Sequence, residues 1–96
     1  MFCDQRSLMW FVYIVRTSRG HLYTGVASDV ERRVHEHNHA ARGSRILRGQ
    51  RPVHLVWSRC VANRSQAQKL EFKIKALSRE AKERFVDGDL FIEIGI

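Results

Sequence analysis

Trp10-Phe11-Val12-Tyr13-Ile14-Val15 is the stretch of sequence that decides the fold. It is aromatic or β-branched at every position, and it is apolar at both odd and even positions. Residues of these types favour strands, and an apolar run without alternation is typical of a strand covered on both faces. We therefore expect a central β-strand with packing on both sides of the sheet.

A second strand follows closely. Residues 17–20 are polar and end in glycine, and residues 21–26 return to a composition typical of strands, so the two runs predict a β-hairpin. If residues whose numbers sum to 36 pair across it, which requires an odd-numbered loop, Tyr13 lies opposite Tyr23. Both phenol side chains then project from the same face of the sheet.

A helix is expected next. Ser28 and Glu31 form a capping-box pattern, and apolar residues recur behind it at helical spacing as far as Ala41. The helix is therefore expected to begin near Asp29.

A third strand and two further helices complete the prediction. Pro52 introduces a strand over Val53–Ser58, since proline is tolerated at the first position of a strand. Ser65 and Gln68 form a second capping-box pattern before a long amphipathic helix. Ser78 marks a break before a short last helix.

The order β-β-α-β-α(α) predicts an α+β fold with a small three-stranded, mostly antiparallel sheet flanked by helices. A chain of 96 residues has the size of one domain. We expect a single domain over residues 1–96, with a core at about 10–86 and terminal extensions at 1–8 and 87–96.

Sequence features also bear on localisation. The longest apolar run, Leu8–Val15, is far shorter than the roughly 20 residues of a membrane-spanning helix, so no membrane association is expected. The two cysteines, Cys3 and Cys60, have no metal-type or redox-type spacing. A reducing cytoplasm is therefore the expected localisation.

The charge distribution points to a polyanionic partner. Seventeen Lys and Arg residues against ten Asp and Glu give a formal net charge of +7, and thirteen of the cations are arginine. No acidic residue lies between Glu36 and Glu71, an interval that holds seven cations. Guanidinium groups bind phosphate oxygens in a bidentate manner, which favours nucleic acid over a mere contribution to solubility.

An ordered set of residues resembles a known family. Phe11-Val12-Tyr13 is followed after a gap by Tyr23-Thr24-Gly25, and Arg33 comes ten residues after Tyr23 on the first predicted helix. The pattern is similar to that of the GIY-YIG nuclease superfamily, and more narrowly to its small stand-alone single-domain members, the YhbQ-like (UPF0213) proteins. The resemblance covers roughly residues 10–86.

That resemblance implies a phosphodiesterase site on one face of the sheet. It implies that Tyr23 is the general base or positions the attacking water, with Tyr13 beside it. It makes Arg33 the clamp that offsets charge on phosphate. It makes Glu71 the single ligand of Mg²⁺ (or Mn²⁺), a cation that takes few protein carboxylates. No small-molecule cofactor is expected.

Two further residues matter in this comparison. His37 stands where many relatives carry tyrosine, and it could hydrogen-bond Tyr23 or a phosphate, or act as the base itself, since its reference pKa of about 6.5 suits neutral pH. The identity of the base, Tyr23 or His37, is left open. Gly25 is expected to allow a close approach of helix or substrate.

The remaining basic and aromatic residues have expected roles of their own. Phosphate contacts along the DNA backbone are expected from four arginines spaced by three residues: Arg42, Arg45, Arg48 and Arg51. Weaker neutral contacts are expected from Ser44, Gly49 and Gln50. Trp10 and Trp57 are expected in the core. Among the alternating histidines, only His35 and His39 share a helix face, which argues against a zinc site.

The function that follows is hydrolysis of DNA phosphodiesters by a metal-dependent endonuclease that serves DNA repair or the processing of structured DNA. The alternative is a catalytically weak nucleic-acid-binding module with the same fold. A third possibility is a domain that binds an acidic protein. Neither the oligomeric state nor the preferred DNA structure follows from the sequence.

Overall fold

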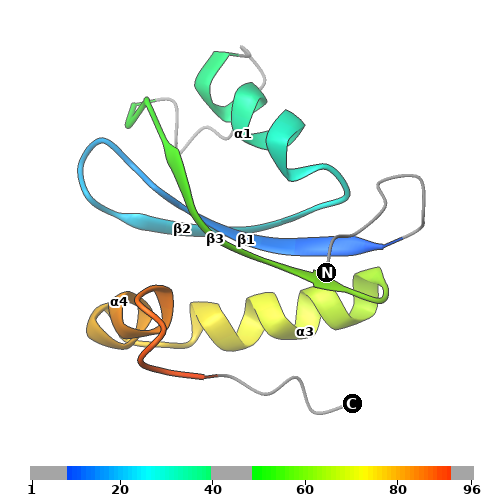
Figure 1. Ribbon diagram of the computed structural model, residues 1–96. Coiled ribbons are helices and arrows are strands. Elements are labelled where there is room, and N and C mark those ends of the chain that lie inside the picture. The colour runs from blue at the N-terminus through cyan, green and yellow to red at the C-terminus, as the bar shows by residue number, and fades with distance from the viewer. Residues whose placement is uncertain (1–8, 40–48, 92–96) are drawn as a thin grey trace.

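A three-stranded antiparallel sheet lies between two helical layers in the computed structural model (Figure 1). The structure describes residues 9–39 and 49–91. The elements are β1 (Trp10–Arg16), β2 (Leu22–Ala27), α1 (Val30–His39), β3 (His54–Val61), α3 (Arg64–Lys75) and α4 (Arg79–Val86). Helix α1 covers one face of the sheet, and α3 and α4 cover the other (Figure 1). The predicted element order and fold class are confirmed.

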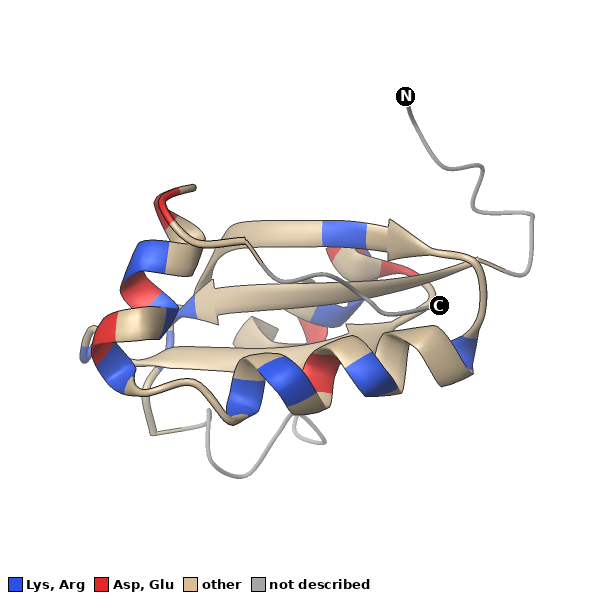
Figure 2. Ribbon diagram, turned by 90° about the horizontal axis from the view of Figure 1, so that it is seen from below, with Lys and Arg blue, Asp and Glu red and all other residues tan. Residues whose placement is uncertain are grey.

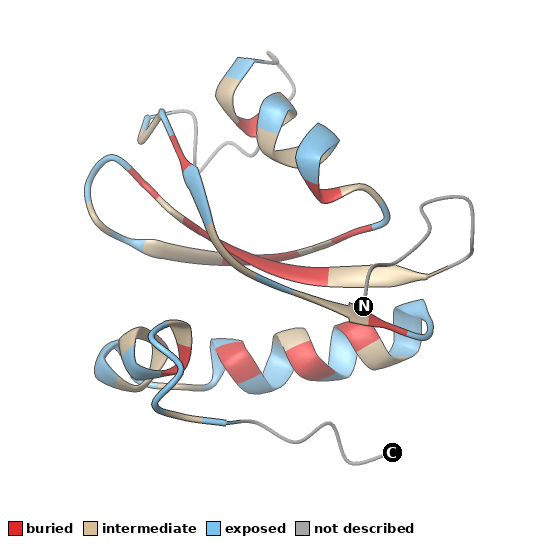
Figure 3. Ribbon diagram, viewed as in Figure 1, coloured by how far each residue is buried: buried red, intermediate tan, exposed pale blue. Residues whose placement is uncertain are grey.

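Strand β1 is the centre of the sheet, whose strand order is β2-β1-β3. Four consecutive residues of β1, Val12–Val15, are buried, as the red segment in Figure 3 shows. Val12 and Ile14 pack with α3 and α4, whereas Tyr13 and Val15 pack on the α1 side. The unbroken apolar run is therefore explained by a separate core on each face.

The register of the hairpin differs from the predicted one. Tyr13 pairs with Gly25 and Val15 pairs with Tyr23, so the paired residue numbers sum to 38 instead of 36. The reason is the loop: the Thr17 amide donates to the His21 carbonyl at 2.8 Å, and the Thr17 hydroxyl accepts from the His21 amide at 3.1 Å. These bonds close a loop over residues 17–21. Because 38 is also even, Tyr13 and Tyr23 still share one face.

The helix caps differ from the predicted capping boxes. The Asp29 carboxylate, not Ser28, accepts from the Arg32 amide at 3.1 Å, and α1 begins at Val30. At α3, Asn63 is the N-cap: its side chain accepts from the Gln66 amide at 2.9 Å, and Gln66 accepts in turn from the Ala62 amide. The capping residues Asn63 and Gln66 thus lie two residues before Ser65 and Gln68.

The last helix begins as predicted. The Ser78 side chain accepts from the Ala81 amide at 3.1 Å and caps α4. Among the described residues, no helix has both the length and the apolar character needed to cross a membrane.

The C-terminal part of α1 is tied to the segment that enters β3. The Asn38 side chain accepts from the Val53 amide at 2.7 Å and donates to the Val53 carbonyl at 3.1 Å. These two bonds satisfy both backbone groups of a buried residue. They also hold the helix over the face that carries Tyr13 and Tyr23.

Candidate active site

A pocket of about 250 Å³ opens between α1, α3 and strands β1 and β2. Four of the residues expected at the site line it, namely Tyr13, Tyr23, Arg33 and Glu71, and Gly25 lies in its wall. They come from four different elements, so the tertiary fold brings them together. His37 is not among the lining residues.

Gly25 allows the Tyr13 ring to lie across β2. A Cβ atom at position 25 would stand 2.5 Å from Cζ and 2.9 Å from Cε1 of Tyr13, and it would also overlap the hydroxyl oxygen. Real Cβ atoms do not approach other atoms so closely. Only glycine is compatible with this ring position. The group that approaches Gly25 closely is the Tyr13 ring, and not the helix or the substrate that was expected.

The Tyr13 hydroxyl is held by His37, with 2.8 Å between the hydroxyl oxygen and Nε2. Tyr13 is 1% exposed. Desolvation by burial raises the pKa of Tyr13 to about 12, although the positive charge of Arg33 opposes the shift. The phenol is therefore neutral at physiological pH, and it acts as a hydrogen-bonding group and not as a base.

His37 is fully buried behind Tyr13. Desolvation and the positive charge of Arg33 lower its pKa from 6.5, so the imidazole is neutral at pH 7. Its ring lies 5.7 Å from the Tyr23 ring, nearly edge to face, and its Nδ1 atom has no hydrogen-bond partner. The hydrogen-bond partner of His37 is thus the Tyr13 hydroxyl and not the expected Tyr23 hydroxyl, although the Tyr23 ring packs against the imidazole.

Arg33 reaches the pocket from α1. Its Nη1 atom donates to Oε1 of Glu36 at 3.1 Å. Desolvation lowers the pKa of Arg33, but the bond to Glu36 and the interaction with Tyr13 outweigh it, and the net shift is upward. The hydrogen bond from Arg33 is also the main reason that the pKa of Glu36 is lowered. The guanidinium is thus charged and oriented before any phosphate arrives.

Glu71 projects from α3, and its side chain is 25% exposed. Its Oε2 atom lies 3.4 Å from Nζ of Lys75. Within the described part of the chain, no group of three His, Cys, Asp or Glu side chains could hold a metal ion together. A lone carboxylate in an open pocket fits Mg²⁺ or Mn²⁺, whose remaining ligands are water and substrate phosphate, better than zinc.

Three residues that line the pocket were not predicted from the sequence to be site residues: Trp10, Arg64 and Gln68. The Arg64 guanidinium carbon lies 5.4 Å from the centroid of the Trp10 ring, an arrangement typical of a cation–π contact. Arg64 and Gln68 precede Glu71 by seven and three residues, so the three side chains share one helix face. That spacing was the available signal, but the capping-box interpretation had already assigned Gln68 another role.

Of the four arginines expected to contact the DNA backbone, the structure describes Arg51 alone. Arg42, Arg45 and Arg48, together with Ser44, lie outside the described residues. Arg51 is half-buried, and its Nε atom donates to the backbone carbonyl of His37.

Two other expected features have a structural role. The Gln50 side chain accepts from the Thr17 hydroxyl at 2.8 Å and lies 3.0 Å from Nδ1 of His21, so it supports the hairpin. The rings of His35 and His39 lie 4.4 Å apart on one face of α1. This placement confirms that His35 and His39 share a helix face.

Comparison with known proteins places the chain among relatives. Residues 9–84 match the sequence model of a family described as the GIY-YIG catalytic domain. A UPF0213 protein of Vibrio cholerae is 50% identical over 80 residues, which cover 82% of this chain and 78% of the relative. The UPF0213 protein YhbQ of Escherichia coli O127:H6 is 42% identical over 86 residues, or 88% and 85% of the two chains.

A solved structure is also similar. The solution NMR structure of a UPF0213 protein from Bacillus halodurans aligns with a TM-score of 0.55 at 34% identity, and the alignment covers 82% of this chain and 83% of the other. The family match includes the segments that carry both tyrosines, Arg33 and Glu71.

Substitution of Gly25 tests the packing of Tyr13. We expect Gly25→Ala to lower the free energy of unfolding by about 1–3 kcal/mol, because the methyl group overpacks the site. Gly49→Ala is the matched control, since nothing lies within 4 Å of a Cβ there. Urea unfolding measures both variants, and equal stability of the two would contradict the packing described.

The buried imidazole predicts a pH dependence of stability. The folded protein keeps His37 neutral, whereas in the unfolded chain the imidazole takes up a proton at a pH of about 6.5. The free energy of unfolding therefore decreases as the pH is lowered through 6.5, and it stops decreasing once the pH is below the lowered pKa of the folded state. The carboxyl groups of Glu36 and Glu83, whose pKa values are lowered from 4.5, change the free energy of unfolding mainly below that pH. Urea unfolding at several pH values between about 7 and 5 should show the decline in the wild type and not in His37→Gln. A flat wild-type profile would refute the assignment.

Proposed function

The chain belongs to the GIY-YIG family, and from that membership we propose that it is a metal-dependent endonuclease that hydrolyses DNA phosphodiesters. The superfamily consists of nucleases, which act on nucleic acid and generally use divalent metal ions. The proposal adds DNA as the substrate, Mg²⁺ or Mn²⁺ as the metal, and DNA repair or the processing of structured DNA as the process served.

The observation that carries the proposal is the convergence of two phenols, a guanidinium and a carboxylate on one pocket. Tyr13, Tyr23, Arg33 and Glu71 are separated by up to 58 residues in sequence, yet all line the same 250 Å³ space. Hydrolysis of a phosphodiester requires a positioned water, charge stabilisation on the phosphate and a cation site. The pocket offers side chains for each of these.

Arg33 is the proposed phosphate clamp. Its side chain is 38% exposed, one of its donors is used by Glu36, and the guanidinium also interacts with the Tyr13 hydroxyl. The remaining donors are available to two phosphate oxygens, and a guanidinium held in advance loses little freedom on binding. Arg33 would therefore stabilise the extra negative charge that develops as water adds to phosphorus.

Tyr23 is the proposed group that orients the attacking water. Tyr23 lines the pocket, whereas His37 is buried and bonded to Tyr13. This arrangement favours Tyr23 over His37 for contact with substrate. His37 then acts as a positioning residue that fixes the Tyr13 hydroxyl, and Tyr13 donates or accepts a hydrogen bond at the pocket wall.

Glu71 is the residue that would hold the metal, together with water and the phosphate itself. A bound Mg²⁺ would supply positive charge to the phosphate and to the leaving oxygen. Lys75 neutralises Glu71 in the structure through a contact of 3.4 Å. The half-exposed ammonium can move aside, since a surface pair of this kind contributes less than about 1 kcal/mol.

Loss of the carboxylate tests the metal site. We expect Glu71→Gln to reduce Mg²⁺-dependent nicking by at least about a hundredfold, because the amide keeps the shape of the side chain but not its charge. The assay is plasmid nicking together with a panel of branched, single-stranded and duplex oligonucleotides. Glu80→Gln removes an exposed carboxylate of α4 outside the pocket and should cleave as the wild type does.

The same assay separates the proposal from its alternative. Salt-sensitive DNA binding without cleavage of any substrate, and indifferent to Glu71→Gln, would identify a nucleic-acid-binding module with the same fold.

The choice between the two candidate bases is tested by Tyr23→Phe and His37→Gln. We expect Tyr23→Phe to lower kcat by about 10²–10⁴ while leaving the free energy of unfolding unchanged, because a half-buried hydroxyl is lost from the reaction site. His37→Gln should cost about 1–3 kcal/mol of stability and retain more activity than Tyr23→Phe. A wild-type kcat in Tyr23→Phe would refute this role of Tyr23.

A further inference from the structure

A second pocket, of about 230 Å³, lies where the β1–β2 hairpin meets α4. Its lining residues are Gly20, His21, Leu22, Arg79, Lys82 and Glu83. None of them lines the candidate active site. The pocket is therefore a separate surface with a chemistry of its own.

The pocket has an excess of positive charge. Its one acidic residue, Glu83, is held by Arg16 in a bidentate ion pair, with N–O distances of 2.7 and 2.9 Å. Arg16 lowers the pKa of Glu83, so the carboxylate is ionised and its charge is balanced. Among the described residues, neither Arg79 nor Lys82 forms an ion pair with a carboxylate. Arg79 also contributes to the lowered pKa of Glu83, but Arg16 already pairs with that carboxylate, so Arg79 and Lys82 leave the pocket with a net positive charge.

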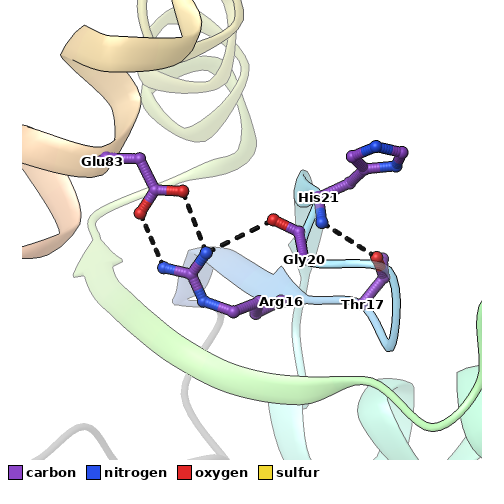
Figure 4. A network of polar contacts seen from close by, with 5 residues as sticks. All are labelled: Arg16, Thr17, Gly20, His21 and Glu83. Carbon is purple, nitrogen blue, oxygen red and sulfur yellow. Dashed lines mark hydrogen bonds and ion pairs between the residues drawn. The ribbon is translucent and has the colours of Figure 1, made fainter.

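The walls of the pocket are held in place before any ligand arrives (Figure 4). Besides its bonds to Glu83, Arg16 donates to the Gly20 carbonyl at 3.3 Å, which joins the hairpin loop to α4. Gly20 has a φ of 83°, a conformation that glycine adopts without strain. The His21 amide is bonded to Thr17, and the His21 ring contacts Gln50. A ligand would find this surface already formed.

The position of the pocket relates it to the catalytic pocket. Leu22 lines the second pocket, and Val26, four residues further along β2, lines the first. At about 3.3 Å per residue, the two positions are about 13 Å apart along this edge strand. Helix α3 lies beneath the sheet and carries exposed lysines along its length (Figure 2).

We propose that Arg79 and Lys82, in the pocket between α4 and the β1–β2 hairpin, bind a backbone phosphate of the nucleic acid, away from the phosphate that is cleaved. This inference rests on the proposed nucleic-acid substrate. Each strand of a duplex has one phosphate per about 3.4 Å of helix axis, so a separation of 13 Å corresponds to about four nucleotides. The pocket sets the direction in which the strand leaves the active site, along β2 toward α4.

Single-charge substitutions on α4 test the proposal. Binding of a fluorescein-labelled single-stranded DNA of about 12 nucleotides is followed by fluorescence anisotropy, without divalent metal, over a series of salt concentrations. Each lost phosphate contact should reduce the slope of log Kobs against log[salt] by about 0.7. We expect part of this reduction in Arg79→Gln and in Lys82→Gln, and the full reduction of about 0.7 in the double variant, which loses the one phosphate contact of the pocket.

Arg84→Gln is the matched control. It removes one positive charge from the same helix at an exposed position outside the pocket, and its slope should equal that of the wild type. A labelled DNA of two nucleotides, too short to occupy both pockets, should lose less affinity in the pocket variants than the longer strand does. Circular dichroism confirms that each variant is folded.

The outcomes separate this inference from the proposed function. Pocket variants with wild-type affinity and slope, a slope change as large in Arg84→Gln, or no binding of DNA by the wild type would each overturn the inference. Wild-type protein that binds but never cleaves would refute the proposed hydrolysis and leave the phosphate pocket standing. If the wild type cleaves DNA and the pocket variants bind DNA as the wild type does, the phosphate pocket is refuted and the proposed hydrolysis stands.

Discussion

The hydrogen bond between the Tyr13 hydroxyl and His37 is the interaction on which the rest of the site depends. It joins the central strand to α1, and the Tyr13 ring reaches it only by passing over Gly25 on the neighbouring strand. Three elements are thus positioned by one pair of side chains. Burial keeps both partners neutral, so the bond persists at physiological pH and the wall of the candidate active site has a defined shape.

The charged residues are placed around this neutral pair and not within it. Arg33 is oriented by Glu36, Glu71 is balanced by Lys75, and Arg64 rests on Trp10, all at the partly exposed rim of the pocket. This arrangement avoids the free-energy cost of burying a charge, because charges at the rim retain much of their hydration and the desolvated interior holds only groups that can stay neutral. An anionic substrate would meet cations at the rim and hydroxyl groups at the wall.

Much of the candidate site could be predicted from the sequence, from the alternation of side chains along the strands and from the spacing of residues along the chain. Tyr13 and Tyr23 share a face in every hairpin register in which the numbers of paired residues add up to an even number. The prediction of a shared face is therefore right, although the predicted sum of 36 differs by two from the observed sum of 38. Arg33 and Glu71 were found because they accompany the tyrosines in an ordered pattern. The partner of His37 could not be found, because the spacing of residues along α1 does not say which strand the helix crosses. Gln68 was missed as a site residue because the capping-box interpretation with Ser65 had assigned it to the start of α3.

The sequence by itself determined the element order, the central position of β1, the shared face of the two tyrosines and the excess of arginine. These properties follow from local periodicity, residue type and composition, which need no knowledge of long-range contacts. Only the tertiary structure decided that Tyr13 pairs with His37, that Gly25 makes room for the phenol ring, and that Arg16 and Glu83 build a second basic pocket at the hairpin. Each of these depends on distances between elements far apart in the chain, and such distances are set by how the two faces of the sheet are packed.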